Sequence, residues 1–233
     1  MDQFDEIKSS HPDTILFFRM GDFYELFHDD AEIASEILGL ALTSRDKKAQ
    51  DPIRMAGFPW HALEDNIRGM LKAGHKVCVA EQEEELREGA KILERTVSRI
   101  YTPGSLYEES LLGTDDRSLL IAICLGSDSL GMGVVDASTG QAWASTCHGV
   151  DRFAKALDEV LRWNPSEIVI SPSDAEDNTL CAMFSHLDGV AISQHRASEA
   201  KRRQCLTKGL NVADLGHVDL DEAPLAIAAA GLA

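Results

Sequence analysis

Short apolar runs alternate in this chain with segments whose apolar residues recur every three or four positions, and this alternation limits the folds available to it. The run TILFFRM (14–20) is rich in β-formers and predicts a buried strand. The next segment, DDAEIASEILG (29–39), has one apolar face, aspartates at its start and Gly39 at its end, which predicts a capped amphipathic helix. The same reasoning predicts a helix over 61–73 and strands over 76–80 and 96–101. We therefore expect the first block to be a mixed α/β domain.

A connecting segment, TPGSLYEESLLGTDDR (102–117), separates this block from a second one, because it combines Pro, Gly and a cluster of acids. We place the boundary near residue 115, which gives a first domain of residues 1–115 and a second of 116–219. The second block opens with three strand-like segments and continues as helix, strand, helix and strand, an order that resembles the ribonuclease H fold. Residues 220–233 contain strong helix formers without a stop signal, so we expect a helix that continues in a longer protein.

The composition is that of a soluble globular protein, with 44% hydrophobic residues. No apolar run is long enough to cross a bilayer, and the N-terminus lacks the basic and apolar regions of a signal peptide. We therefore expect a cytoplasmic protein without a membrane partner. The five cysteines are widely spaced and form no C-x-x-C pair, so we interpret them as buried small hydrophobic residues.

The net charge of −17 argues against a nonspecific nucleic-acid binder, which would normally carry a basic face. The basic residues gather in three clusters: Arg45, Lys47 and Lys48; Arg87, Lys91, Arg95 and Arg99; and Lys201, Arg202 and Arg203. We interpret these clusters mainly as solvated faces.

The common catalytic motifs are missing. The sequence contains no G-x-x-x-x-G-K-[ST], no G-x-S-x-G and no H-E-x-x-H, so we expect no cofactor, no metal and no catalysis. A nuclease on a ribonuclease H-like domain would need carboxylates that converge on metal ions, one of them on the first strand. That strand, SLLIAIC, carries no acid, and the ASTG after Asp136 predicts a turn. A metal nuclease is therefore a disfavoured alternative.

The stretch MGDFYELF (20–27) follows the first predicted strand and leaves Phe23 at a turn. This ring has two interpretations: it folds back onto the core, or it is an apolar wedge that enters the DNA minor groove and kinks the duplex. Glu25 would lie on the same side of an extended segment as Phe23. There its carboxylate could meet the edge of a displaced base while repelling phosphate.

Three consecutive segments resemble signature segments of the N-terminal domain of the MutS family of DNA mismatch repair proteins. They are FFRMGDFYELFHDDAEIASEILGLALTSRD, PIRMAGFPWHALEDNIRGMLKAGHKVCVAEQ and SRIYTPGS. The resemblance covers nearly all of residues 11–112, while 117–219 are similar in pattern to the connector domain of that family and the tail to the start of its lever region. It implies a mixed α/β mismatch-recognition domain followed by a ribonuclease H-like connector domain, with mismatched double-stranded DNA as the ligand.

The resemblance also assigns roles to individual residues. In the family a Phe-x-Glu motif stacks on the mismatched base and hydrogen-bonds it, and Phe23 and Glu25 match this motif with Tyr24 as an inward structural residue. The other implied site residues are Gly21 and Asp22 in the turn and Met55, Gly57 and Pro59 in the support beneath it. Arg45 and Arg99 are our candidates for contact with the DNA backbone.

The clamp and ATPase domains of the family, and its lever beyond the first helix, have no counterpart in these residues, so ATP and magnesium are expected only in that ATPase domain. The resemblance further implies a homodimer in the full-length protein and a connector that relays its state to partners. A second interpretation is a protein-interaction module that docks a MutL-type repair partner without binding DNA itself.

Overall fold

The structure is a computed structural model that describes residues 1–45, 52–83, 93–104, 118–185, 187, 189–212, 215 and 224–233. The described residues form two compact units, which succeed one another in the sequence at Pro103 and Gly104. The predicted boundary near residue 115 lies outside the described residues and stays a prediction.

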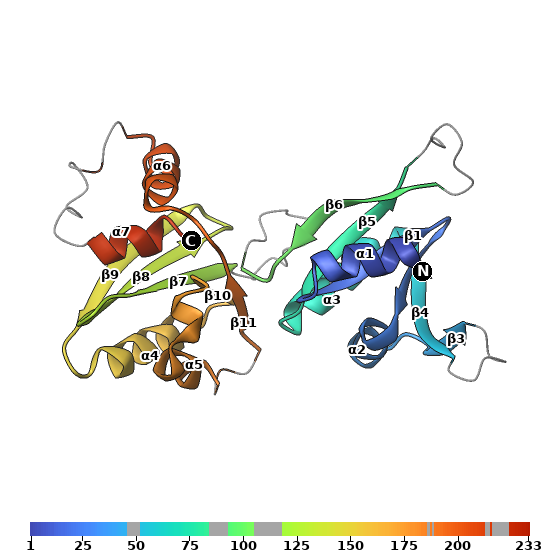
Figure 1. The fold of residues 1–233 in the computed structure, drawn as a ribbon, viewed down its shortest axis with the longest axis horizontal. Coiled ribbons are helices and arrows are strands. Elements are labelled where there is room, and N and C mark those ends of the chain that lie inside the picture. The colour runs from blue at the N-terminus through green and yellow to red at the C-terminus, as the bar shows by residue number, and fades with distance from the viewer. Residues whose placement is uncertain are drawn as a thin grey trace. The chain divides into compact units, whose positions relative to one another are not determined.

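Unit 1 is built around a six-stranded sheet, which we call sheet 1, with the strand order β3-β4-β2-β1-β5-β6 (Figure 1). Strands β1 and β5 are parallel, and every other neighbouring pair is antiparallel. The elements are α1 (Asp2–Ser10), β1 (Thr14–Met20), β2 (Phe23–Phe27), α2 (His28–Leu38), β3 (Thr43–Arg45), β4 (Ile53–Pro59), η1 (Trp60–Ala62), α3 (Leu63–Lys72), β5 (Lys76–Gln82) and β6 (Arg95–Tyr101). This mixed sheet confirms the predicted α/β class.

The two faces of sheet 1 are covered by different helices. On one face Phe4 of α1 packs against the rings of Phe18 and Phe27, together with Leu16 and Cys78. The other face carries the alternate strand residues, which are buried beneath the apolar residues of α2 and α3 (Figure 1). We call these the α1 face and the α2/α3 face.

The start of α2 differs from the prediction. Gly39 ends the helix in the left-handed conformation as expected, with φ 68°. No aspartate side chain caps its first turn, and the N-cap position is Phe27. Asp30 instead accepts hydrogen bonds from the Leu16 backbone N at 3.0 Å and from Lys8 Nζ at 2.8 Å. Strand β2 has turned into α2 beside Leu16, so this carboxylate satisfies a β1 amide that the sheet leaves unpaired.

Unit 2 contains a five-stranded sheet, which we call sheet 2, with the order β11-β10-β7-β8-β9. Strands β7, β8 and β9 are antiparallel, whereas β10 and β11 run parallel to β7. The elements are β7 (Leu119–Leu125), β8 (Ser129–Asp136), β9 (Gln141–His148), α4 (Arg152–Trp163), β10 (Glu167–Ile170), η2 (Asp174–Glu176), α5 (Asn178–Phe184), β11 (Ala191–Gln194), α6 (Glu199–Gly209) and α7 (Pro224–Ala230). The predicted ribonuclease H-like succession of an antiparallel opening and helix–strand alternation is therefore present.

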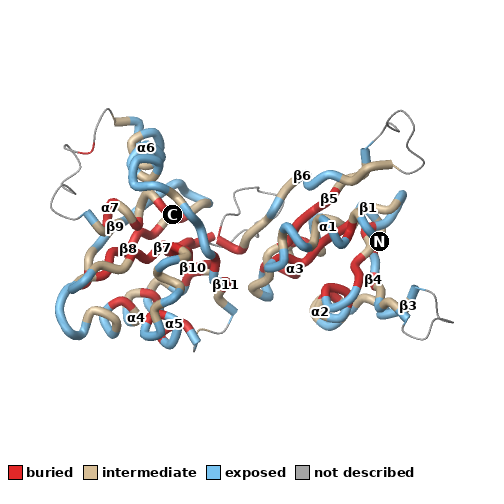
Figure 2. The backbone as a smooth tube through the Cα atoms, viewed as in Figure 1, coloured by how far each residue is buried: buried red, intermediate tan, exposed pale blue. Residues whose placement is uncertain are grey.

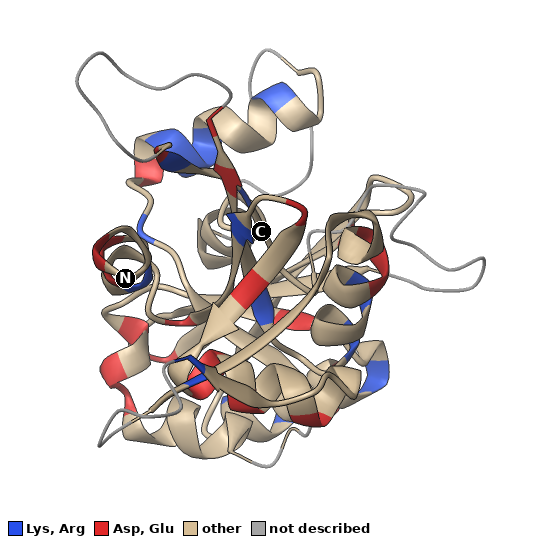
Figure 3. Cartoon of the chain, turned by 90° about the vertical axis from the view of Figure 1, so that its right-hand side faces the viewer, with Lys and Arg blue, Asp and Glu red and all other residues tan. Residues whose placement is uncertain are grey.

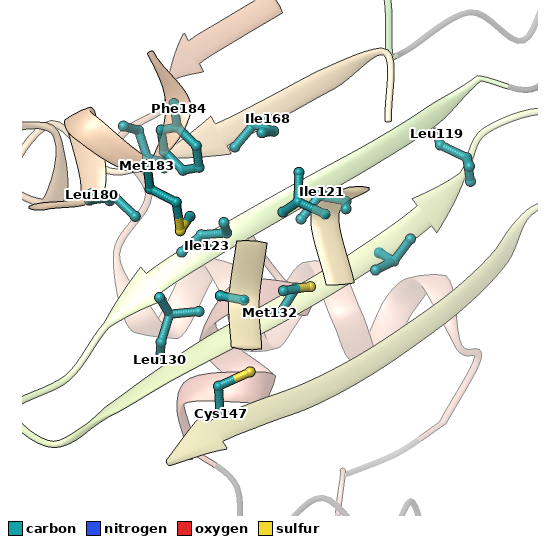
Figure 4. Packing of buried hydrophobic residues seen from close by; sticks show 14 residues of the cluster. Leu119, Ile121, Ile123, Leu130, Met132, Cys147, Ile168, Leu180, Met183 and Phe184 are labelled. Atoms are coloured by element: carbon teal, nitrogen blue, oxygen red, sulfur yellow. The ribbon is translucent and has the colours of Figure 1, made fainter. Parts of the chain in front are cut away.

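Sheet 2 has an apolar core on each face. Figure 4 shows one of them, in which Ile121, Ile123 and Met132 of the sheet meet Leu180 and Phe184 of α5. The central strands of both sheets are buried, whereas α6 is largely exposed (Figure 2).

The other face of sheet 2 is covered by α7. A Cβ added to Gly131 would lie 2.2 Å from the Leu225 carbonyl oxygen, so this glycine permits the close approach of the helix. Ala229 and Leu232 join Ala122 and Cys124 in the core beneath it. The last helix therefore packs within unit 2, and its expected role at the start of a lever region stays a prediction.

Unit 2 tests two predictions from the sequence, the burial of its cysteines and the turn after Asp136. Cys124 and Cys147 are buried as expected, but Cys181 and Cys205 are exposed, because they lie on the outer sides of α5 and α6. Asp136 forms the predicted turn, since its carboxylate accepts hydrogen bonds from the Ser138 backbone and hydroxyl groups. Within the described ranges no helix is both long and apolar enough to cross a membrane.

Candidate nucleic-acid interface

A tight turn joins β1 to β2 and presents Phe23. Met20 and Phe23 are the last paired residues, so Gly21 and Asp22 form a two-residue hairpin loop. Gly21 has φ 62° and Asp22 has no positive φ, which fits a type II′ turn with glycine at its first central position. The two turn residues expected from the sequence thus occupy the loop that precedes Phe23.

The pleat of β2 separates Phe23 and Glu25 from Tyr24. Phe23 is 48% exposed and Tyr24 is 1% exposed, while Glu25 is partly buried. Successive side chains of a strand point to opposite faces, so Phe23 and Glu25 share the α1 face. Phe23 therefore does not fold back onto the core, and its ring stands at the end of the sheet with a carboxylate two residues away.

Tyr24 holds the hairpin from the α2/α3 face. Its hydroxyl donates to the Glu81 carboxylate, and its ring lies 5.6 Å from that of Phe58, measured between centroids. The Arg19 guanidinium lies 5.2 Å from the centroid of the Tyr24 ring. Burial and the hydrogen bond to Glu81 raise the pKa of Tyr24, so the phenol stays protonated and can donate. These contacts fix the strand that carries Phe23.

Strand β4 supports β2 along its length. Pro59 pairs with Phe23, Gly57 with Glu25 and Met55 with Phe27. A Cβ on Gly57 would lie 2.9 Å from the Tyr24 carbonyl oxygen, so a larger residue would push against the backbone. The structure thus places the three expected support residues Met55, Gly57 and Pro59 beside the motif.

Two arginines flank Glu25 from opposite edges of sheet 1. Arg45 of edge strand β3 extends inward, with its guanidinium 6.0 Å from the centroid of Phe27. Arg95 of edge strand β6 extends inward from the other side, 5.5 Å from the centroid of Phe18. Phe18 is the β1 residue that pairs with Glu25. Both positive charges therefore lie on the face of Glu25 and next to it.

Arg95 is held in place by three oxygen acceptors. It donates to the Arg19 carbonyl at 3.2 Å, the Leu93 carbonyl at 2.7 Å and Gln82 Oε1 at 2.9 Å. Burial lowers the pKa of Arg95, and the nearby Glu25 charge opposes this effect. The arginine is thus a fixed cation at this surface.

Burial and nearby positive charges shift the pKa of Glu25 in opposite directions. Burial raises its pKa above the ordinary value of 4.5, while the positive charges of Arg45 and Arg95 counteract that rise. The carboxyl group is therefore more easily protonated than an exposed glutamate, and the charges of the two arginines partly offset this effect of burial.

Arg99 lies on the other face of the sheet. The register of β5 and β6 shifts between Val79 and Ala80, so that Arg99 pairs with Val79 while Val97 pairs with Ala80. Cys78 and Ala80 belong to the α1 face, so Val79 and Arg99 point to the opposite face. The structure thus brings Arg45 to Glu25 but not Arg99. Arg95, which the sequence pattern assigns only to a solvated cluster, lies beside Glu25 instead.

Across the part of the chain that the structure describes, the remaining charged residues form no broad basic surface. Acidic and basic residues are interspersed on the elements of both units (Figure 3). Lys47, Lys48, Arg87 and Lys91 lie outside the described residues. In α6, Arg203 pairs with Glu199, and Arg202 turns inward to donate to the Ala197 carbonyl. Among described residues, no group of three or more His, Cys, Asp or Glu could hold a metal ion.

Comparison with known proteins matches both units to one family. Residues 1–110 match the family model for MutS domain I, and residues 118–233 match the model for MutS domain II.

Curated relatives agree with these matches. The chain is 35% identical over 235 residues to the DNA mismatch repair protein MutS of Symbiobacterium thermophilum, covering 99% of the chain and 27% of that protein. It is 36% identical over 237 residues to MutS of Myxococcus xanthus, covering 100% of the chain and 26% of that protein. It is 40% identical over 194 residues to MutS of Desulforamulus reducens, covering 83% of the chain and 22% of that protein. The chain therefore spans about a quarter of the length of these relatives. Through its two domains, the chain belongs to the MutS family of DNA mismatch repair proteins.

Proposed function

We propose that unit 1 recognises a mispaired or unpaired base in duplex DNA. Phe23 enters the minor groove and stacks on that base, and Glu25 hydrogen-bonds its edge. The observation that carries this proposal is the half-exposed Phe23 ring at the end of β2, with Glu25 on the same face.

The physical basis of selectivity is the energy needed to unstack the duplex. Inserting an apolar wedge between bases costs a few kcal/mol in paired DNA and less where pairing is already broken. Stacking of a base on an aromatic ring contributes about 1–3 kcal/mol. A wedge must keep its position to use this difference, and the packing of Tyr24 and the pairing with β4 support Phe23 from behind.

Arg45 and Arg95 have a complementary role in this proposal. An ionised Glu25 repels phosphates, which weakens binding to any duplex. The two arginines lie beside it and present positive charge to the same surface. They thus reduce the repulsion and are our candidates for contacts with the DNA backbone, whereas Arg99 faces away.

The remaining roles concern a longer protein. We propose that unit 2 acts as a connector that relays the state of the recognition domain and docks a MutL-type partner. Homodimerisation and the binding of ATP and magnesium would belong to domains that the relatives carry beyond the matched quarter of their length. We propose no catalytic reaction for domains I and II themselves.

The direct test is a fluorescence anisotropy titration of this chain against three labelled duplexes of one sequence: fully matched, with a G·T mismatch, and with an unpaired thymine. Measurement at low salt, about 20 mM, makes weak binding visible. We expect tighter binding to both heteroduplexes than to the matched duplex. Phe23→Ala should remove this preference while leaving most of the binding to matched DNA.

Leu42→Ala is the matched control, because Leu42 is 48% exposed like Phe23 but lies between α2 and β3. It should leave the preference unchanged. If Phe23→Ala weakened binding to all three duplexes equally, or lowered the melting temperature as much as a core truncation, Phe23 would have a structural role and the proposal would be wrong.

A further inference from the structure

Trp60 is a second large aromatic side chain beside the hairpin that carries Phe23. It begins the short helix η1 directly after β4 and is 52% exposed. Its backbone N donates to the Asp22 carbonyl at 2.9 Å, which ties it to the β1–β2 turn. Among the described Phe, Tyr and Trp residues of unit 1, only Phe23 and Trp60 are exposed.

The two aromatic side chains project from opposite faces of the same end of sheet 1. The Arg19 guanidinium lies 5.5 Å from the centroid of the Trp60 ring and 5.2 Å from that of Tyr24. Arg19 and Tyr24 are paired residues on the α2/α3 face. Trp60 therefore stands on that face, while Phe23 stands on the α1 face.

The contacts of Trp60 are those of a preorganised stacking surface. Arg19 is itself fixed, because its Nε donates to the Gly21 carbonyl, so the indole rests on a positioned cation. Half of the indole surface remains in water, although its burial would be favourable. An aromatic ring next to a positive charge is the combination that binds the faces of nucleotides in single-stranded or unstacked nucleic acid.

We propose that Trp60 stacks on a nucleotide next to the one that Phe23 engages, in the same DNA duplex. A wedge that opens a base step and kinks the helix exposes nucleotide faces on both sides of the opened step. Phe23 would contact one of them from the α1 face, and Trp60 would contact its neighbour from the α2/α3 face. This inference rests on the proposed function of unit 1 and adds a second contact to it.

Intrinsic fluorescence can test this contact, because the other two tryptophans, Trp143 and Trp163, both lie in unit 2. The variant Trp143→Phe/Trp163→Phe leaves Trp60 as the one tryptophan of the chain. Its emission is followed during titration with unlabelled duplex containing an unpaired thymine, and a parallel anisotropy titration with labelled duplex measures binding itself. We expect quenching of Trp60 emission that saturates at the same DNA concentration as the anisotropy.

Substitutions at Trp60 give a second readout. Trp60→Ala should weaken binding to the heteroduplex about tenfold, in line with the loss of one stacked base, whereas Trp60→Phe should keep most of the affinity. Leu42→Ala serves as the exposed control and should have no effect. Thermal melting of each variant checks that unit 1 remains folded.

The outcomes separate this inference from the proposed function. If anisotropy shows mismatch-selective binding that depends on Phe23 while Trp60 emission stays constant, Trp60 does not contact DNA and this inference is wrong, although the proposed function stands. If emission and anisotropy both respond but heteroduplex and matched duplex bind equally, Trp60 contacts DNA and the mismatch-recognition role fails. An absence of DNA binding in low salt overturns both.

Discussion

Arg95 and Glu25 share one face of sheet 1, although β1 and β5 separate their strands. The Arg95 guanidinium reaches inward over the ring of Phe18, the direct partner of Glu25, and is held there by three oxygen acceptors. Arg45 approaches from the opposite edge over Phe27. The candidate base-contacting carboxylate is thus partly buried but lies between two cations, which makes its charge adjustable by either of them.

The first prediction concerns the electrostatic coupling between Arg95 and Glu25. Arg95→Met keeps an unbranched side chain over Phe18 but removes the charge, so the pKa of Glu25 should rise further. The carbon-13 shift of the Glu25 carboxyl group during an NMR pH titration measures this pKa directly. Arg99→Met is the matched control, because Arg99 faces away from Glu25, and it should leave the titration unchanged. An unaltered Glu25 titration in Arg95→Met would refute the coupling.

The second prediction concerns the role of Glu25 in selectivity. Glu25→Gln retains a group that can hydrogen-bond a base but removes the charge that repels phosphate. Binding to matched duplex should therefore tighten more than binding to a G·T duplex, so affinity rises while selectivity falls. Glu25→Ala removes both effects and should bind the mismatch less well than Glu25→Gln. If Glu25→Gln bound matched DNA more weakly than the unchanged chain, the repulsion would be disproved.

The third prediction is a pH dependence of stability. The pKa of Glu25 is raised by burial in the folded chain, so the folded state favours the protonated form. The contribution of Glu25 is then most favourable below its unfolded pKa, ordinarily 4.5, and is lost as the pH rises through the folded pKa. Glu25→Gln should accordingly increase the free energy of unfolding at pH 7 relative to the unchanged chain, and this gain should disappear in acid.

Urea denaturation of the transition that belongs to unit 1, repeated from acid to neutral pH, provides the measurement. Glu36→Gln makes the same chemical change on the exposed side of α2 and serves as the comparison. An advantage of Glu25→Gln that stayed constant over the whole pH range would show that the amide stabilises the fold for another reason.

The shared face of Phe23 and Glu25 could be predicted from the sequence, because it requires only the two-residue period of a strand. The faces on which Arg95 and Arg99 lie could not be predicted in this way. In a regular strand Arg95 and Arg99, four residues apart, would lie on the same face. One extra residue in β6 turns the Arg99 side chain to the opposite face. Such a bulge leaves no signal in the local pattern of TVSRIY.

Long-range packing explains the other differences between expectation and structure. Asp30 has the sequence position of a helix-capping residue, yet its carboxylate serves a β1 amide that lies next to it only in the assembled sheet. Trp60 directly follows the expected support residue Pro59 in the sequence, and its exposure follows from the place where β4 ends and from the contact with Arg19. Each depends on residues distant in sequence, which local periodicity does not encode.

The fourth prediction tests the support beneath the motif. Gly57→Ala introduces a Cβ 2.9 Å from the Tyr24 carbonyl, a backbone atom that cannot move without disturbing β2. We expect a loss of about 1–3 kcal/mol in the stability of unit 1, together with reduced mismatch preference. Gly69→Ala is the control, because its new Cβ would meet only the end of the Leu38 side chain. Equal melting temperatures for Gly57→Ala and the unchanged chain would show that β4 does not restrain β2.

The fifth prediction is a shallow salt dependence of DNA binding. The chain carries a net charge of −17, and the described basic residues that lie next to Glu25 are Arg45 and Arg95. Neutralising about two phosphates gives a slope near −2 in a plot of log K against log salt, or about a tenfold loss of affinity between 50 and 200 mM. Binding of this chain at physiological salt should therefore be weaker than micromolar. Anisotropy titrations at four or more salt concentrations measure the slope.

A slope near −6 would contradict this prediction and show that further cations contact DNA. Substitution of Lys47 and Arg87, which lie outside the described residues, would then test whether they are among these cations.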